Sequence, residues 1–252
     1  MIDATKKDFN RSFDMTDLGL MHYCLGLEVW QKENHIFVSQ LKYTETTLKK
    51  FRMMDCTPIA TPMEVRLQLS RSDPSPPMNA TLYLQLIRSL IYLTYTRPDI
   101  SFAVSYLSHF MQEPKICHWK AAKRILRYLK GIVDLGVEYK KNDNFFLIGY
   151  SNSDHAGNMD DRKSTLGFVF FMGSGPISWG SKKQNFVSHS SIEEEYRAAG
   201  EVVCEAIWLR QILEGIGLPQ QKSTPVYVDN EGALKLVRNL VFHERTKHIE
   251  VQ

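Results

Sequence analysis

The sequence is poor in cysteine and contains no long apolar run. Its four cysteines lie far apart along the 252 residues and form no Cys-x-x-Cys pair. This spacing disfavours a disulfide framework or a zinc knuckle and indicates a reducing compartment. The longest apolar stretches are interrupted by Arg88, Thr94 and Thr96, well short of the roughly 18 residues that a membrane span needs. Residues 1–12 have no apolar core, which argues against a secretory signal peptide. We therefore expect an intracellular protein without a membrane partner, in either the cytoplasm or the nucleus.

The net charge of the chain is also small. The chain has 31 Lys and Arg residues against 28 Asp and Glu residues, for a formal net charge of +3. Any affinity for nucleic acid must therefore come from where the charges lie. Hydrophobic residues make up 43% of the chain and charged residues 23%, which excludes wholesale disorder. The length suits one large domain or two modest ones.

The first half of the chain is predicted to contain a hairpin, a connector and several helices. Five of the ten prolines fall within 55–80, which predicts a connector without regular structure, because proline removes backbone donors and fixes φ. Ser39 is a plausible N-cap for a helix that ends near residue 51. The remaining patterns predict a short helix at 2–14, a hairpin formed by 23–30 and 35–38, and helices at about 80–95, 98–112 and 115–130.

The second half has an α/β pattern. Strands are predicted at 145–151, 166–172 and 177–189, the first apolar on both faces and therefore central and buried. A long helix should follow at 191–214, opened by a capping-box pattern of Ser191 and Glu194. A short strand at 226–228 and a helix at 231–238 complete the pattern, so the fold class is α+β. The four tryptophans are expected in the core.

Three residues form a candidate metal site. Asn152 follows the 145–151 strand and Asp229 follows the 226–228 strand, and ligand sites in α/β sheets collect at such carboxyl ends. Glu195 heads the apolar stripe of the long helix, formed by Ala199, Val202, Ala206, Leu209 and Leu213. A carboxylate held near other acidic groups would repel them unless a cation holds the group together. The alternative is that Glu193, Glu194 and Glu195 merely favour the helix N-terminus electrostatically.

A basic stripe is the second candidate. Lys120, Lys123, Arg124 and Arg127 share one face of the 115–130 helix, and no acidic residue interrupts 115–133. The stripe is either a phosphate-facing surface or an ordinary solvated helix face. The stretch Arg124-Ile125-Leu126-Arg127 also matches the RxLR pattern of secreted effectors. It lies mid-chain in an amphipathic helix, so no targeting role is expected from it.

Sequence blocks that carry a resemblance stand in one order along nearly the whole chain. The first half contains MTDLGLMHYCLGLEV (15–29), LIRSLIYLTYTRPDISFAVSYLSHFM (86–111) and KAAKRILRYLKGIVDLGVEY (120–139). The second half contains GYSNSDHAG (149–157), DRKSTLGFVFFMG (161–173), SHSSIEEEYRAA (188–199) and VYVDNEGAL (226–234). The first three blocks look like the later part of the reverse transcriptase of a copia-type retrotransposon Pol polyprotein, and the last four resemble the ribonuclease H domain that follows it. The resemblance implies a palm-edge and thumb remnant at 1–54, a Pro-rich connector at 55–80, a helical connection region at 81–143, and a C-terminally truncated ribonuclease H-like α/β domain at 144–252.

The resemblance also implies a chemistry, which is hydrolysis of RNA in an RNA–DNA hybrid by two Mg²⁺ ions held by four carboxylates. The first carboxylate falls on Asn152, where the family has Asp, the second on Glu195 and the third on Asp229. The fourth is expected beyond Gln252. The polymerase Tyr-x-Asp-Asp turn is expected before residue 1, so polymerase activity is not expected.

We therefore expect a degenerate Pol fragment that is inactive alone. Its partners would be an RNA–DNA hybrid or other nucleic acid and the remaining Pol polyprotein segments. Two alternatives remain open, which are an active metal-dependent hybrid ribonuclease with a reduced site and a non-enzymatic nucleic-acid-binding or effector-type protein.

Overall fold

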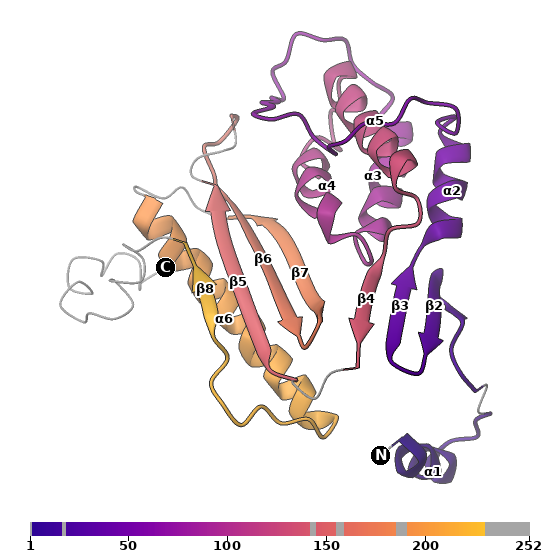
Figure 1. Cartoon of the computed structure of the whole chain (residues 1–252). Coiled ribbons are helices and arrows are strands. Elements are labelled where there is room, and N and C mark those ends of the chain that lie inside the picture. Colours follow the sequence, from indigo (N-terminus) through magenta and orange to yellow (C-terminus); the bar gives the residue numbers. More distant parts are fainter. Residues whose placement is uncertain (1, 17–18, 142–144, 155–158, 185–190, 230–252) are drawn as a thin grey trace, which may run out of the picture.

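The chain folds around two sheets that lie side by side (Figure 1). The first sheet is antiparallel and the second is mixed. The computed structural model describes residues 2–16, 19–141, 145–154, 159–184 and 191–229. Within this part of the chain, no helix is long and apolar enough to cross a membrane. The predicted α+β class is confirmed, because helices and sheets both contribute to each half. The predicted helix at 231–238 lies outside the described residues.

The first sheet has the order β1-β2-β3-β4, with antiparallel neighbours throughout. The helix α1 (Ile2–Ser12) precedes it. The expected strand at 23–30 is split by a turn, because Leu25 and Gly26 both have positive φ. Val137 pairs with Val38, so residues about 100 positions apart share this sheet. Its strands are β1 (Tyr23–Cys24), β2 (Leu27–Lys32), β3 (His35–Ser39) and β4 (Val137–Lys140).

A helical cluster packs at one end of this sheet (Figure 1). It contains α2 (Leu41–Lys50), α3 (Ala80–Leu93), the 3-10 turn η1 (Pro98–Ile100), α4 (Ser101–Ser108) and α5 (Ile116–Gly131). Asn79 caps α3 by accepting a hydrogen bond from the Leu82 N–H at 2.9 Å. The predicted N-cap at Ser39 is wrong, because Ser39 still belongs to β3 and Gln40 precedes α2 without a side-chain cap bond. The helix expected at 98–112 is shorter, since η1 leads into α4, which ends at Ser108.

The Pro-rich connector has the expected lack of helix and strand, apart from one isolated bridge between Pro77 and Lys115. It is nevertheless anchored to the helical cluster. The Tyr106 hydroxyl accepts a hydrogen bond from the Leu69 N–H at 2.9 Å. The buried His118 ring lies 3.9 Å from the Phe110 ring, centroid to centroid, and bonds the Ser70 carbonyl at 3.2 Å. These polar contacts replace the regular hydrogen bonds that the prolines prevent.

The second sheet has the order β7-β6-β5-β8. The predicted parallel pairing of the strands near 150 and 227 is confirmed, because Ser151 of β5 pairs with Val228 of β8 in parallel. The boundaries of β5 differ from the prediction, since Asn152 to Asp154 remain paired with β6 and therefore lie within the strand. Part of the strand expected at 177–189 lies outside the described residues. The strands are β5 (Leu147–Asp154), β6 (Thr165–Met172), β7 (Gly175–Lys183) and β8 (Val226–Val228).

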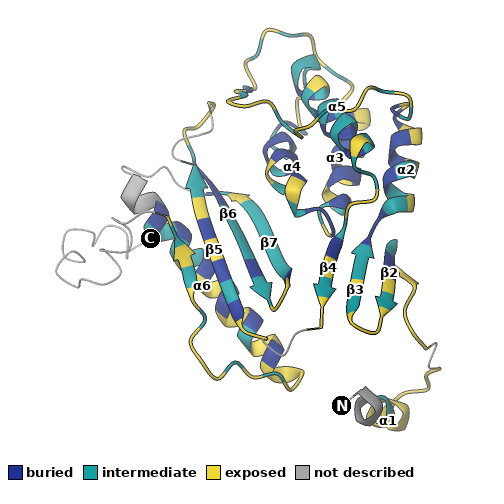
Figure 2. Ribbon diagram, viewed as in Figure 1, coloured by how far each residue is buried: buried dark blue, intermediate teal, exposed yellow. Residues whose placement is uncertain are grey.

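The long helix α6 (Ser191–Gly215) covers one face of the second sheet (Figures 1 and 2). Val202, Leu209 and Leu213 pack there with Leu166 and Phe170, and Ala198 is buried rather than the expected Ala199. Gly149 is required at this interface, because a Cβ on it would lie 2.5 Å from the Phe170 ring. The side chains of the expected capping box lie outside the described part. Two tryptophans contradict the expectation of burial, since Trp30 is 59% and Trp208 is 52% exposed.

Direct hydrogen bonds join the two halves. The Trp179 indole Nε1 donates to the Thr94 carbonyl at 2.8 Å, the Ser105 hydroxyl donates to the Ser181 carbonyl at 2.9 Å, and the Tyr139 hydroxyl donates to the Pro176 carbonyl at 2.7 Å. All three bonds involve a residue of β7, the strand that faces α4 and β4. The side chain of Trp179 is therefore held in place from outside its own sheet.

Candidate functional site

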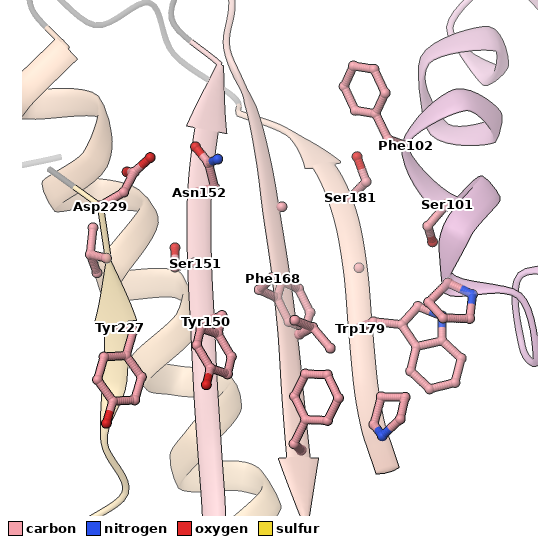
Figure 3. Close-up of a pocket in the computed structure, with 17 residues that line it drawn as sticks. Ser101, Phe102, Tyr150, Ser151, Asn152, Phe168, Trp179, Ser181, Tyr227 and Asp229 are labelled. Carbon is pink, nitrogen blue, oxygen red and sulfur yellow. The ribbon is translucent and has the colours of Figure 1, made fainter. Parts of the chain in front are cut away.

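Two rows of side chains cross the face of the second sheet that α6 leaves uncovered. Pairing in register places Tyr227, Tyr150, Val169 and Trp179 side by side, and we call this set the aromatic row. Two residues further along β5, the register aligns Asn152 with Gly167 and Gly167 with Ser181, and Asp229 directly follows the last residue of β8 beside them. We call Asp229, Asn152, Gly167 and Ser181 the polar row. Because side chains alternate between faces with a period of two, both rows point to the same side (Figure 3).

The polar row brings two of the three predicted residues together. Asn152 pairs with Gly167, and Asp229 is the first residue after the Val228–Ser151 pair of the parallel strands β8 and β5. Adjacent strands are about 4.8 Å apart, so the two side chains are neighbours, as Figure 3 shows. Both are exposed. The two residues thus lie together toward the carboxyl ends of β5 and β8, as the sequence pattern predicted.

Glu195 approaches from the opposite face. It lies in α6, is only 5% exposed, and its Oε1 accepts a hydrogen bond from the Ser153 N–H at 3.1 Å. This N–H belongs to the peptide bond between Asn152 and Ser153, so the Glu195 carboxylate lies against the backbone of the polar row. A bond to one particular backbone group is more specific than a general attraction to the helix N-terminus. The structure therefore gathers all three predicted residues at one end of β5.

The donors present do not fit a two-metal centre. Asn152 offers a neutral amide oxygen, and the nearby Asp154 carboxylate accepts a hydrogen bond from the Thr165 N–H. Among the residues that the structure describes, no three His, Cys, Asp or Glu side chains gather closely enough to hold a metal ion. A pair of Mg²⁺ ions requires several anionic oxygen ligands to offset the repulsion between the ions. The site as described supplies too few of them.

A groove of about 650 Å³ lies over the two rows. Its floor is formed by β5 to β8, and Pro98, Ser101 and Phe102 line it from the side of α4 (Figure 3). The Tyr150 and Tyr227 rings are stacked with centroids 5.2 Å apart. Sequence reasoning missed this groove. The signal was the alternation of aromatic and polar residues at Tyr150 and Asn152 and at Tyr227 and Asp229, which the assignment of β5 as buried on both faces concealed.

The basic stripe of α5 is only partly available to a partner. Arg124 donates from Nη1 to the Glu64 carboxylate and from Nη2 to the Thr61 hydroxyl, both at 3.0 Å. Arg127 donates from Nε to the Thr57 carbonyl at 2.8 Å. Both arginines thus hold the Pro-rich connector against α5. Of the four predicted nucleic-acid residues, Lys120 is exposed and Lys123 is half-buried.

Comparison with known proteins identifies the family to which the chain belongs. A family model described as reverse transcriptase (RNA-dependent DNA polymerase) matches residues 1–65. The chain is 38% identical over 249 residues to the retrovirus-related Pol polyprotein from transposon RE2 of Arabidopsis thaliana, covering 99% of this chain and 17% of that protein. It is 39% identical over 261 aligned residues to the corresponding polyprotein from transposon TNT 1-94 of Nicotiana tabacum, covering 100% of this chain and 20% of that protein. The chain is thus a reverse-transcriptase-related polypeptide. It belongs to the copia-type retrotransposon Pol polyprotein family, of whose matched members it spans about a fifth.

A third relative bears on the RxLR pattern. Half of this chain is 44% identical over 128 residues to the secreted RxLR effector protein 161 of Plasmopara viticola, of which 90% is covered. In this chain the four residues of the pattern lie within α5, where Arg124 and Arg127 bind the connector. No solved structure matches the chain.

Proposed function

We propose that residues 144–252 form the ribonuclease H-like part of a copia-type Pol polyprotein, and that this chain binds an RNA–DNA hybrid without cleaving it. The observation that carries the proposal is the polar row. It sets Asn152 beside Asp229, with Glu195 bound to the adjacent backbone, so that a carboxamide stands at the position where the resemblance implies the first carboxylate.

The arrangement of the strands supports the domain assignment. Antiparallel β7, β6 and β5 are followed in the sheet by β8, which is parallel to β5, and α6 crosses between β7 and β8 along the chain. The three positions that the resemblance singles out are far apart in sequence and meet at one end of β5. A shared site requires this convergence.

The carboxamide explains the expected loss of cleavage. Asn152 removes one negative charge from the place where two dications would repel each other. Two-metal sites contribute several kcal/mol to the transition state, and each 1.36 kcal/mol is about tenfold in rate. Weakened metal binding should therefore reduce the rate by orders of magnitude. Asp154 does not replace the missing group, because it lies two residues further along the strand, about 6.6 Å away, and it already binds the Thr165 N–H.

Hybrid binding is assigned to the part of the basic stripe that remains available. Lys120 lies exposed on α5 and Lys123 lies one turn further along. Neither makes an ion pair with an acidic side chain among the described contacts. Point charges of this kind attract phosphate without reading sequence, and their contribution falls with salt.

The test is incubation of an RNA–DNA hybrid with the purified chain in Mg²⁺ and, separately, in Mn²⁺. Asp229→Asn serves as the background control, and a filter-binding or anisotropy assay measures hybrid affinity in parallel. We expect binding by the wild-type chain, with no cleavage above that control. Cleavage well above the control would establish instead an active ribonuclease with a reduced site.

The second part of the experiment restores the carboxylate at position 152. Asn152→Asp returns the missing carboxylate without changing the size of the side chain, and it should raise metal affinity even if cleavage also needs further Pol segments. Absence of hybrid binding by every variant would overturn the nucleic-acid assignment. It would favour a different role for the chain, of the kind that the effector relative suggests.

A further inference from the structure

We propose that the outer face of α6 pairs with the same face of a second copy of the chain, as two antiparallel helices related by a two-fold axis. This pairing goes beyond the proposed hybrid binding, and it needs neither nucleic acid nor a metal ion. It is inferred from the apolar character of the outer face, from the small residues at its centre and from the area that it offers.

The helix α6 is apolar on two sides, although the sheet covers only one of them. A surface helix of a soluble protein normally carries polar residues opposite the stripe that faces the core. On α6, one stripe packs against the second sheet, and large apolar side chains also stand on the outer side, between 42% and 55% exposed (Figure 2). The outer face is the part of α6 that carries these side chains, which are Val203, Ile207, Trp208, Ile212 and Ile216.

Polar contacts along both flanks of α6 fix which side of the helix points outward. Toward β7, the Glu201 carboxylate accepts a hydrogen bond from Lys182 Nζ at 2.9 Å. The Glu205 carboxylate accepts one from the Ser178 hydroxyl at 2.7 Å. On the opposite flank, Arg210 donates to two backbone carbonyls of the segment that leads into β8. These charged groups already have partners at the rim, so covering the surface between them does not bury an unpaired charge.

Small residues lie at the centre of the outer face. Gly200 and Cys204 are one turn apart and both exposed, and a Cβ on Gly200 would meet nothing within 4 Å. Packed helix axes are about 8–10 Å apart, and each Cα lies about 2.3 Å from its own axis. Two Cys204 residues that face each other across such a pair therefore have their Cα atoms about 3.5–5.5 Å apart, which overlaps the range of a disulfide.

A two-fold axis through Cys204 matches a large residue with a small one. Trp208 lies four residues after Cys204, and Gly200 lies four residues before it. In an antiparallel pair centred on Cys204, Trp208 of each copy therefore faces Gly200 of the other, where the missing side chain leaves room for the indole. The outer face is thus complementary to itself, which is what a two-fold interface requires.

The area of the outer face reaches the size that a specific dimer needs. Five large apolar side chains, each about half exposed, offer about 400 Å² of apolar surface per copy. Two copies would bury about 800 Å² of it, and since about 65% of a homodimer interface is apolar, the whole interface would measure about 1,200 Å². Specific interfaces begin at about this size. We therefore expect a reversible dimer with a Kd in roughly the micromolar range.

The experiment measures the mass of the full chain in solution by sedimentation velocity. The buffer is reducing and free of nucleic acid, and the chain concentration runs from about 1 to about 200 μM. We expect the mass to rise with concentration toward that of two chains. Gly200→Leu should keep the monomer folded, because Leu is the better helix former and a Cβ has room there. In the dimer the new side chain would occupy the place of the Trp208 ring, so association should weaken at least about tenfold.

Two further variants and one crosslink test the same pairing independently. Trp208→Lys should also weaken association at least about tenfold. Val65→Lys is its matched control, since Val65 is 88% exposed in the Pro-rich connector, and it should leave association unchanged. Oxidation of the wild-type dimer with diamide should join two chains through Cys204. Cys204→Ser should prevent this crosslink, whereas Cys24→Ser, which removes the other exposed cysteine, should not.

The proposal fails if the wild-type chain stays monomeric over this range. The reaction of Cys204 with a thiol reagent would then show whether the outer face is open or is covered by another part of the chain, and either result excludes the second copy. It also fails if Gly200→Leu and Trp208→Lys associate as tightly as the wild type, or if the crosslink forms without Cys204. Because no nucleic acid is present, these outcomes do not depend on the proposed hybrid binding.

Discussion

The two lysines and the two arginines of α5 should respond to mutation in opposite ways. The double variant Lys120→Gln and Lys123→Gln removes charges that bind no acidic side chain in the described contacts. The double variant Arg124→Gln and Arg127→Gln removes the contacts that hold the connector on α5. Each variant removes two positive charges from the same helix, so the two are matched in net charge and differ only in what the side chains touch.

The arginine pair should contribute mainly to stability. The ion pair of Arg124, 20% exposed, with Glu64, 61% exposed, is screened by water and contributes about 0–1 kcal/mol. The bonds to the Thr61 hydroxyl and the Thr57 carbonyl add about 1 kcal/mol each. The total of about 2 kcal/mol corresponds to a decrease of about 4–8 °C in Tm for a chain of this size. The lysine variant should leave Tm unchanged.

The lysine pair should contribute mainly to nucleic-acid binding. Each lost phosphate contact reduces the slope of log affinity against log salt by about 0.9, so the lysine variant should lose about 1.8 units. Thermal unfolding and hybrid binding at 50–200 mM salt measure both quantities. The reasoning is refuted if the arginine variant keeps the wild-type Tm while losing salt dependence, because the arginines would then face phosphate rather than the connector.

Three further outcomes are expected. Burial lowers the pKa of His118, whose Nδ1 accepts a hydrogen bond from the Lys115 N–H at 3.0 Å. Because the pKa is lower in the folded chain, the unfolded chain takes up the proton first as pH falls. The contribution of His118 to stability is therefore present above about pH 6.5 and is lost as pH falls below it. The free energy of urea unfolding should differ less between pH 7.5 and pH 5.5 for His118→Gln than for the wild type. Gly136→Ala should destabilise by about 1–3 kcal/mol, since its Cβ would lie 2.3 Å from the Val38 carbonyl oxygen; an unchanged Tm would contradict this. Asn152→Asp should lower Tm in EDTA and recover it in Mg²⁺, whereas a decrease that Mg²⁺ leaves unaltered would argue against a shared cation.

The sequence predicted those elements whose signal is local. Alternating residues revealed the hairpin of β2 and β3, and clustered prolines revealed the connector. The turn at Leu25 and Gly26 was missed because Tyr23, Leu25, Leu27 and Val29 continue the alternation across it. The strand β4 was missed because its partner β3 lies about 100 residues away, and a four-residue strand has too short a pattern to reveal such pairing.

The candidate site was predicted in part, for the same reason. Apolar runs that end in polar residues correctly placed Asn152 and Asp229 on neighbouring parallel strands. The connector has no periodicity, so nothing in the sequence indicated that Thr57, Thr61 and Glu64 cross over α5 and engage its arginines. The face of β5 was misjudged because Tyr150 was read as a core residue, although it belongs to an exposed aromatic row.

The residue at position 152 decides between two states of the polar row. With Asp there, two carboxylates would stand about 4.8 Å apart on adjacent strands, and their repulsion, about 1 kcal/mol at an exposed site, would favour a bound cation. With Asn152, the row carries only the charge of Asp229, so the sheet needs no cation at this place. The amide adds donors that a carboxylate lacks. The substitution that weakens metal chemistry therefore also removes the repulsion between two carboxylates at this end of the sheet.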